Sequence, residues 1–297
     1  MLFASIERVA RIEAAECRLL ADCTASTARR HPEQVTFVRP IAGGIATLAG
    51  EGSPLNKVAG LGMTGPTVEG GLEGELEAGL EAGLEAGLEE VEQAFARAGV
   101  PVQVELSTLA DPSVLAVLHR RGYALVGFEN VLGLALPSTA PLPVAGDVEI
   151  SPSDEGALNV WLDAVVTGFA HPDEQGVPSH EQFPREALER VIADSASASG
   201  FRRYLARRHG EPAGGASLRL SQGVAQLCGA ATVPAHRRHG VQTALLAARL
   251  EDAARAGCDL AVVTTLPGSR SQHNVQRRGF SLLYSRAILV RESLTHA

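Results

Sequence analysis

Residues 231–243 read ATVPAHRRHGVQT, and this short segment decides how the fold is interpreted. Pro234 has no N–H to donate, so it ends the strand-like run before it. The basic residues 237–239 then stand directly before a predicted helix that starts at Gly240. First-turn N–H groups have no partners within a helix and carry the positive end of its dipole. With the close approach that glycine permits, and a hydroxyl from Thr243, these groups predict a pyrophosphate site.

The elements predicted around this segment form a mixed sheet with helices on its faces. Strands are expected over 148–150, 203–206, 215–220, 224–233 and 260–263, and helices from Asp154 to about Val166, from about Glu181 to Ala193 and from Gly240 to Ala256. Gly and Pro turns separate the middle strands into an antiparallel meander. Gly257 is placed to end the last of these helices.

At residues 237–242, RRHGVQ, the chain resembles the GNAT superfamily of acetyl-CoA-dependent N-acetyltransferases. That family's motif is Arg/Gln-x-x-Gly-x-Gly/Ala, and Gln242 departs from its small last residue. The resemblance covers residues 147–297. It implies that the strand end at Thr232 and Val233 contacts the pantetheine arm and the thioester, while residues 237–243 hold the pyrophosphate. The alternative is a solvated arginine loop before an ordinary helix.

Three polar residues at the next predicted helix, Ser269, Ser271 and Asn274, could point a hydroxyl or an amide towards coenzyme A. Ser271 and its neighbour Ser269 could instead cap that helix. The residues expected to bind acetyl-CoA are therefore Thr232, Val233, Arg237, Arg238, His239, Gly240, Val241, Gln242, Thr243, Ser271 and Asn274.

No catalytic residue is assigned. Many members of the family place a tyrosine acid four residues before the glycine of a Gly-Phe pair, where this chain has Val275. Tyr284 lies later and is expected to pack, and Trp161 is expected in the core. The candidate bases lie in the polar segment 171–181 and are His171, Asp173, Glu174, His180 and Glu181, although such residues are more often solvated loop groups.

The chain's net charge of −8 comes from one segment. Nine glutamates fall within residues 69–92, and without them the remaining residues carry a net charge of +1. No broad basic surface is therefore expected to bind nucleic acid. Within this segment, residues 71–90 repeat Leu-Glu-Ala-Gly every four positions. The repeat predicts either a lengthened helix that continues to Phe95 or an interaction helix.

The two halves of the chain are expected to be copies of one plan, joined by the Pro-rich segment 137–146. At an offset of 157, residues 120–125 (RRGYAL) match residues 277–282 (RRGFSL). The predicted fold class is α/β (α+β), with two tandem GNAT-like domains, each a mixed, mostly antiparallel sheet with helices on both faces. The expected division is a degenerate domain over 1–136, a linker over 137–146 and a catalytic domain over 147–297.

The N-terminal copy lacks an Arg-x-x-Gly segment and has the acidic repeat instead, so it is not expected to bind acetyl-CoA. An acidic helix start would repel a pyrophosphate. The polar turn at residues 53–57 either faces the acceptor site or simply connects strands. This half could also be structural, covering a sheet edge of the other.

The expected function is transfer of acetyl from acetyl-CoA to a primary amine by direct attack in a ternary complex. Cys258 lies in an apolar stretch without a recognisable His partner, so no covalent intermediate is expected. The alternative is a non-catalytic protein that binds or senses acyl-CoA. The other expectations are a small-molecule acceptor, no nucleic-acid partner, no membrane segment, no metal, free thiols and a cytoplasmic location. The sequence leaves the acceptor and the oligomeric state open.

Overall fold

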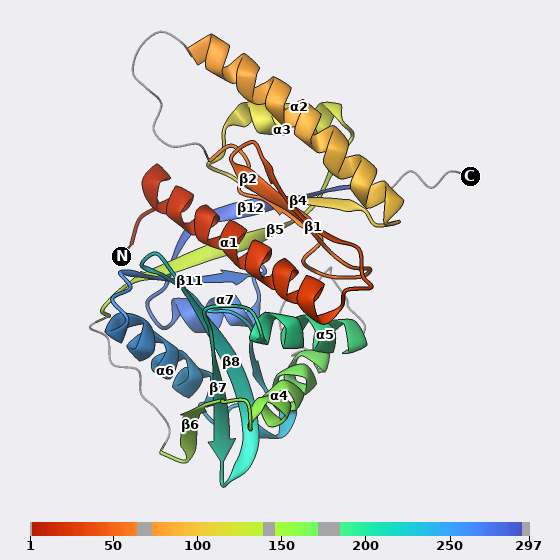
Figure 1. The fold of residues 1–297 in the computed structure, drawn as a ribbon. Helices are drawn as coiled ribbons and strands as arrows, with labels where there is room; N and C mark the ends of the chain where they lie inside the picture. The colour runs from red at the N-terminus through yellow and green to blue at the C-terminus, as the bar shows by residue number, and fades with distance from the viewer. Residues whose placement is uncertain (1, 64–72, 139–145, 172–184, 293–297) are drawn as a thin grey trace. The chain divides into compact units, whose positions relative to one another are not determined.

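The computed structural model describes residues 2–63, 73–138, 146–171 and 185–292 (Figure 1). The chain packs into two compact units. The C-terminal unit contains Val131–Leu283 together with the first residues up to Phe3, and the N-terminal unit contains Ala4–Asn130 together with the chain from Tyr284 onward.

The described strands form one mixed, mostly antiparallel sheet, where two domains with a sheet each were predicted. Its twelve strands follow the order β1-β2-β3-β4-β12-β5-β11-β9-β8-β7-β6, and β10 pairs with β8 outside this path. The physical reason is the length of β5 (Ala124–Ala135) and β12 (Ser281–Arg291), since each contributes residues to both units. The compact units therefore do not coincide with the predicted ranges 1–136 and 147–297.

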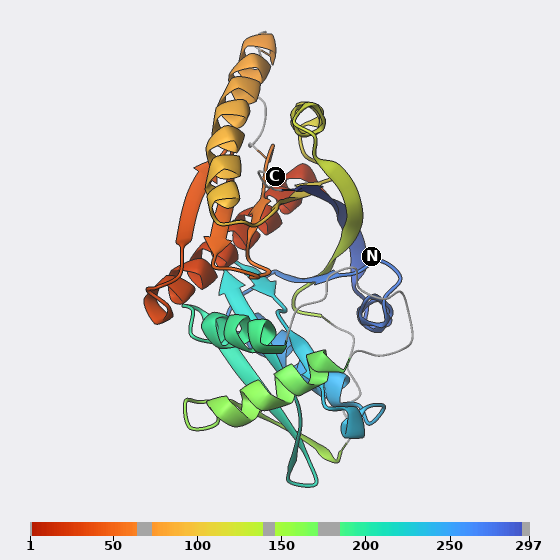
Figure 2. The ribbon, with the colours of Figure 1, turned by 90° about the vertical axis from the view of Figure 1, so that its right-hand side faces the viewer.

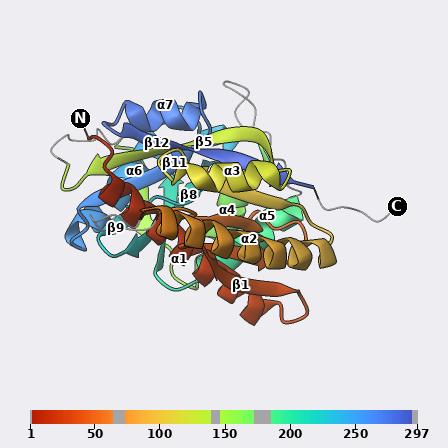
Figure 3. The same cartoon turned by 90° about the horizontal axis from the view of Figure 1, so that it is seen from above.

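The N-terminal unit starts with a long helix and a hairpin. The elements of this unit before β5 are α1 (Ile6–Arg30), β1 (Thr36–Ile41), β2 (Gly44–Ala49), β3 (Lys57–Ala59), α2 (Glu73–Arg97), β4 (Val102–Ser107) and α3 (Pro112–Arg120). The hairpin strands β1 and β2 are antiparallel, whereas β3 and β4 are parallel because α2 forms the crossover between them. Figure 3 shows α2 and α3 lying side by side.

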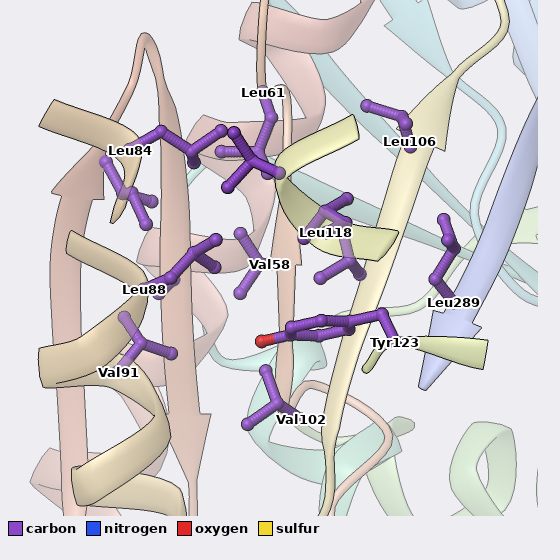
Figure 4. Packing of buried hydrophobic residues seen from close by; sticks show 14 of the residues in the cluster. Val58, Leu61, Leu84, Leu88, Val91, Val102, Leu106, Leu118, Tyr123 and Leu289 are labelled. Carbon is purple, nitrogen blue, oxygen red and sulfur yellow. The ribbon is translucent and has the colours of Figure 1, made fainter. Parts of the chain in front are cut away.

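The acidic repeat forms a helix that has one apolar face in the core. Leu84 and Leu88 are fully buried, and Val91 and Phe95 continue the same face. Figure 4 shows the leucines packing towards residues of the strands and α3, among them Val58. The end of the repeat, with Leu84 and Leu88, is therefore part of a core helix that continues to Phe95.

The glutamates of α2 pair with two arginines at the end of α3. Arg121 Nη1 lies 2.7 Å from Glu85 Oε2, and Arg121 Nη2 lies 2.5 Å from Glu92 Oε2. Arg120 Nη2 lies 3.2 Å from Glu81 Oε2. The hydrogen bond from Arg121 lowers the pKa of Glu85 below its ordinary value. These three glutamates of the described part of this helix are therefore paired with arginines of the same unit.

The C-terminal unit contains the elements predicted around residues 231–243. They are β6 (Val148–Pro152), α4 (Leu158–Ala170), α5 (Arg185–Ala196), β7 (Phe201–Arg208), β8 (Glu211–Ser221), β9 (Val224–Gln226), β10 (Ala230–Thr232), the 3-10 turn η1 (Pro234–His236), α6 (Val241–Arg255), β11 (Leu260–Thr265) and α7 (Arg270–Gln276). Figure 2 shows the β7–β8 hairpin, whose turn contains His209 and Gly210 at positive φ. The prediction of one strand over 224–233 is wrong, because the chain leaves β11 at residues 227–229 and continues as β10 beside β8 alone.

In the C-terminal unit, helices cover both faces of the sheet. On one face α6 buries Leu245 against strand residues such as Leu218, and on the other α4 buries Trp161. A side chain at Gly215 would lie 2.6 Å from Val165 Cγ2, so the close packing of α4 on β8 requires glycine there. The Trp161 indole N–H also donates to the carbonyl of Ala216 (3.3 Å).

The repeated sequence corresponds to repeated structure. The order β4-α3-β5 in the first half recurs as β11-α7-β12 in the second. With the offset of 157, the start of β5 at Ala124 corresponds to the start of β12 at Ser281. The element order therefore agrees with the sequence register.

The N-terminal unit buries a cluster of charged side chains around Arg286, whose side chain is 1% exposed. Arg286 Nε lies 2.9 Å from Glu13 Oε1, and Arg286 Nη1 lies 3.7 Å from Glu105 Oε2 and 3.8 Å from Glu129 Oε2. Lys57 forms an ion pair with Glu105. Glu16 and the hydroxyl of Tyr284, which donates to Glu13, complete the cluster. With four carboxyl groups and two cations, the cluster has a surplus of acid.

This surplus makes stability depend on pH. Burial, together with the nearby charge of Glu105, raises the pKa of Glu129 from 4.5 to about 8. The folded protein therefore keeps a proton that the unfolded chain releases, so this stabilisation is complete below about pH 4.5 and is lost as pH rises to about 8. We expect Glu129→Gln to raise Tm relative to wild type at pH 9 and to leave it nearly unchanged at pH 5.

Calorimetric scans between pH 5 and 9 measure this difference. A loss of about 1 kcal/mol corresponds to roughly 2–4 °C in a domain of this size. The control is Glu51→Gln, at an exposed glutamate of the same unit, for which no such trend is expected. A constant Tm difference between E129Q and wild type over the whole range would contradict the prediction.

Candidate functional site

The site begins where two neighbouring strands part. β9 runs parallel to β11, and the last bond between them is from Leu227 N–H to the carbonyl of Val262 (2.9 Å). Beyond Gly229, β10 pairs with β8 alone. Val233 N–H donates to the carbonyl of Ala213, so the alternating pattern of an antiparallel pair directs the peptide groups of Thr232 away from β8. An open strand edge results.

A cavity of about 740 Å³ occupies this opening. Its walls come from the end of α4, from β10 and η1, from the start of α6, from the end of β11 and from α7. Six arginines line it, and none of its described lining residues is acidic. The arginines are Arg237, Arg238, Arg249, Arg270, Arg277 and Arg278. The cavity is therefore suited to an anion with several charges.

The first turn of α6 lies in the wall of this cavity. Gly240 caps the helix in the left-handed conformation (φ 79°), and no side chain among the described residues caps this helix end. Val241, Gln242 and Thr243 follow in the wall, and the N–H groups of a first turn have no partner within the helix. Arg238 is exposed beside them. The helix N–H groups, the positive end of the dipole and the guanidinium thus lie in one wall of the cavity, an arrangement that suits an anion.

Arg237 has a different position from its neighbour. Its guanidinium donates to the carbonyls of Gly168 (3.4 Å) and His171 at the end of α4. A cation there also complements the negative end of the helix dipole. Arg237 therefore joins the loop to α4, and part of its hydrogen-bonding capacity is occupied by these two carbonyls.

Two further hydrogen bonds hold the cavity walls together. Gln242 Nε2 donates to the hydroxyl of Thr232 (3.1 Å), which joins α6 to β10. Arg278 Nη2 donates to the hydroxyl of Thr243 (2.9 Å), which joins the end of α7 to the first turn of α6. Gln242, which departs from the small residue of the family motif, thus has a partner in the strand that opens.

Arg249 lies beneath the point where the strands part. Its side chain is buried and donates to the carbonyls of Leu245, Ser217 (3.1 Å) and Cys228 (3.4 Å). Burial lowers the pKa of this guanidinium to about 10. Because the carbonyls belong to α6, β8 and the segment after β9, Arg249 joins these three parts of the C-terminal unit beneath the strand break.

Of the eleven residues expected to bind acetyl-CoA, nine line the cavity. They are Thr232, Arg237, Arg238, Gly240, Val241, Gln242, Thr243, Ser271 and Asn274. Val233 and His239 are not among the lining residues. Val233 N–H instead pairs with β8. Ser269 caps α7 by accepting from Gln272 N–H (3.2 Å), as the alternative reading of that residue proposes.

Sequence reasoning missed several lining residues. Gly168 is one: a Cβ there would lie 2.6 Å from Ala231 Cβ, so glycine lets α4 approach β10 closely. Arg249 and the α7 arginines were also missed. The repeated Arg-Arg-Gly was a signal for Arg277 and Arg278, but it was read as evidence of duplication alone.

The structure separates the catalytic candidates. Tyr284 is buried and donates its hydroxyl to Glu13 in the N-terminal unit, as expected of a packing residue. Val275, at the position of the family's tyrosine, lines the cavity. His171 is exposed and its Nδ1 lies 2.9 Å from the carbonyl of Thr167. The other base candidates, Asp173, Glu174, His180 and Glu181, lie outside the described residues.

The cysteines are free thiols, and burial raises the pKa of Cys258 above its ordinary value. A buried, protonated thiol is a poor nucleophile. In the described part of the chain, no group of three His, Cys, Asp or Glu side chains is placed to hold a metal ion. No helix over these residues has the length and apolar character needed to cross a membrane.

Comparison with known proteins agrees with this geometry. Residues 168–280 match the family model of the acetyltransferase (GNAT) family, and this range contains the cavity. No curated protein matches the chain in sequence.

Solved structures share the fold over most of the chain. A GCN5-related N-acetyltransferase from Kribbella flavida is 18% identical, with a TM-score of 0.59 over 92% of this chain and 94% of its own. A conserved protein of unknown function from Staphylococcus epidermidis is 10% identical (TM-score 0.58, 88% and 94%). A tandem GNAT protein of the clavulanic acid biosynthesis pathway is 16% identical (TM-score 0.55, 86% and 80%). The chain thus has a GNAT-like fold.

The two loop arginines should respond differently to substitution. Arg237→Gln loses charge-assisted bonds to the end of α4, so we expect the unfolding free energy to fall by about 1–3 kcal/mol. Arg238→Gln alters an exposed side chain, so its change should stay within about 0.5 kcal/mol. Calorimetric Tm values of the two variants test this. Equal Tm values for R237Q and R238Q would show that Arg237 does not tie the loop to α4.

Proposed function

We propose that the protein is a GNAT-family N-acetyltransferase that uses acetyl-CoA and acetylates a primary amine. The observation that carries the proposal is the cavity at the strand opening, in which six arginines and the first turn of α6 meet without a lining acidic residue. This site coincides with the segment that matches the family model.

Coenzyme A fits the cavity in chemical terms. The first turn of α6, with Arg238 beside it, offers N–H groups and positive charge to the pyrophosphate. The open edge of β10 offers peptide groups at Thr232 to the amides of the pantetheine arm, in the way that strands recognise extended ligands. Ser271 and Asn274 add polar groups from α7. Acetyl-CoA would supply the reactive thioester.

The reaction is a direct transfer. The amine nitrogen forms a bond to the acetyl carbonyl carbon and the C–S bond breaks, while the nitrogen loses a proton and the departing thiolate gains one. No covalent intermediate is invoked, and the Cys258 thiol is buried. The proposed proton acceptor belongs to the segment 171–181, which begins at the end of α4 that Arg237 contacts.

We further propose that the chain is a tandem protein whose N-terminal copy does not bind acetyl-CoA. The repeated order β4-α3-β5 and β11-α7-β12 supports duplication. A solved tandem GNAT protein shares the fold. In the N-terminal unit the helix that corresponds to α6 is α2, whose glutamates neutralise Arg120 and Arg121. A phosphate would meet carboxylates there.

One observation favours a second candidate function, a non-catalytic protein that binds or senses acyl-CoA. Val275 lines the cavity at the position where many family members have a tyrosine acid. An apolar side chain cannot protonate a thiolate, so the acid would have to be another group or water. The two candidates share the binding site and differ only in turnover.

The deciding experiment is a calorimetric titration of acetyl-CoA into the full chain, followed by a thiol-release assay over a panel of amines. We expect one saturable site, and thiol release that depends on a particular amine and yields its acetyl derivative. Gly240→Val should weaken binding about tenfold or more, because Val is strained at φ 79° and its side chain blocks close approach to the helix N–H groups.

Arg255→Gln is the control for this titration, since Arg255 is exposed at the far end of α6 and does not line the cavity. Binding without thiol release over the whole panel would support the acyl-CoA-binding candidate. No binding to wild type, or full binding to G240V, would overturn the assignment of the site.

A further inference from the structure

Three arginines of α7 and the turn after it form one wall of the cavity. Arg270, Arg277 and Arg278 all line it, with Asn274 between them. Arg270 and Asn274 are four positions apart on α7, and Arg277 and Arg278 follow directly after the helix ends at Gln276. This wall is therefore a cationic surface in addition to the groups at the start of α6.

The N-terminal unit has a corresponding pair of arginines, and there the pair lies beside carboxylates. By the 157-residue offset, Arg120 and Arg121 correspond to Arg277 and Arg278. In the N-terminal unit, Glu81, Glu85 and Glu92 of α2 neutralise the pair.

The C-terminal unit has no equivalent carboxylates on the facing helix. α6 begins VQTALLAARL and has its first acidic residue at Glu251, near its other end. Arg278 bonds instead to the neutral hydroxyl of Thr243. The same arginine pair therefore faces a cavity in one unit and an acidic helix in the other.

The charge on this wall exceeds what a pyrophosphate needs. A pyrophosphate diester has two negative charges, and the first turn of α6 with Arg238 already suits them. Coenzyme A has one more anionic group, the 3′-phosphate of its ribose, a monoester with close to two charges at neutral pH. Guanidinium groups suit such an oxyanion through paired hydrogen bonds.

We propose that Arg270, Arg277 and Arg278 bind the 3′-phosphate of coenzyme A, so that the protein selects coenzyme A over 3′-dephospho-coenzyme A. The inference rests on the proposed function, because it assigns a subsite within the same cavity. The bond from Arg278 to Thr243 places the α7 wall beside the first turn of α6, and only the ribose separates the two phosphate groups of the ligand.

The test is calorimetric titration of coenzyme A and of 3′-dephospho-coenzyme A into the full-length wild type and its variants. We expect wild type to bind coenzyme A about tenfold or more tightly than the dephospho form, in line with charge-assisted contacts. Arg277→Gln and Arg270→Gln should each reduce this ratio about threefold or more by weakening coenzyme A alone. Their affinity for the dephospho form should stay within about twofold of wild type.

The matched control is Arg120→Gln, at the position in the N-terminal unit that corresponds to Arg277. Its ratio should equal that of wild type. Arg277 is exposed, so R277Q is expected to fold, and its unchanged affinity for the dephospho form shows that the rest of the site is intact.

The outcomes separate this inference from the proposed function. Equal affinity of wild type for the two ligands would overturn the 3′-phosphate site while leaving coenzyme A binding in place. Variants that weaken the binding of both ligands equally would overturn it too. The arginines would then interact with the pyrophosphate, or would act only through the overall positive potential of the cavity. If neither ligand binds wild type, the proposed function itself fails.

Discussion

The parting of two strands at residues 227–229 is the constraint on which the site depends. Up to Leu227 the chain pairs with β11, and from Ala230 it pairs with β8 alone, so an edge of peptide groups opens inside the sheet. Arg249, buried beneath the break, donates to carbonyls of α6, β8 and the segment after β9. Without this break there would be no gap for a ligand beside the first turn of α6.

The same Arg-Arg-Gly sequence serves two physical purposes in the two units. In the N-terminal unit its arginines join α3 to the acidic face of α2, and they contribute to a closed, paired structure. In the C-terminal unit the facing helix has small, apolar and hydroxyl side chains, so the arginines line a cavity. What differs is the charge of the neighbouring helix, since the arginines and the strand that follows them are alike.

Much of the fold followed from local patterns. The Leu-Glu-Ala-Gly repeat, the cap at Gly240 and the meander between Phe201 and Ser221 depend on neighbouring residues, and the structure has them where the sequence places them. The break at residues 227–229 was missed because the apolar pattern of residues 224–233 is the same whether the chain stays paired with β11 or leaves it. The single sheet was missed as well, because strand pairing between segments as distant as 102–107 and 286–291 leaves no local signal.

The sequence by itself predicted the anion site that we propose at the start of α6. A strand-ending proline, basic residues and a glycine before a helix are adjacent in the chain, so their order alone pointed to residues 237–243. Only the tertiary structure decided how each side chain is used. It bonds Arg237 to the end of α4, brings the arginines of α7 opposite α6, and buries Tyr284 against Glu13. These roles depend on which elements meet in space, which no local pattern encodes.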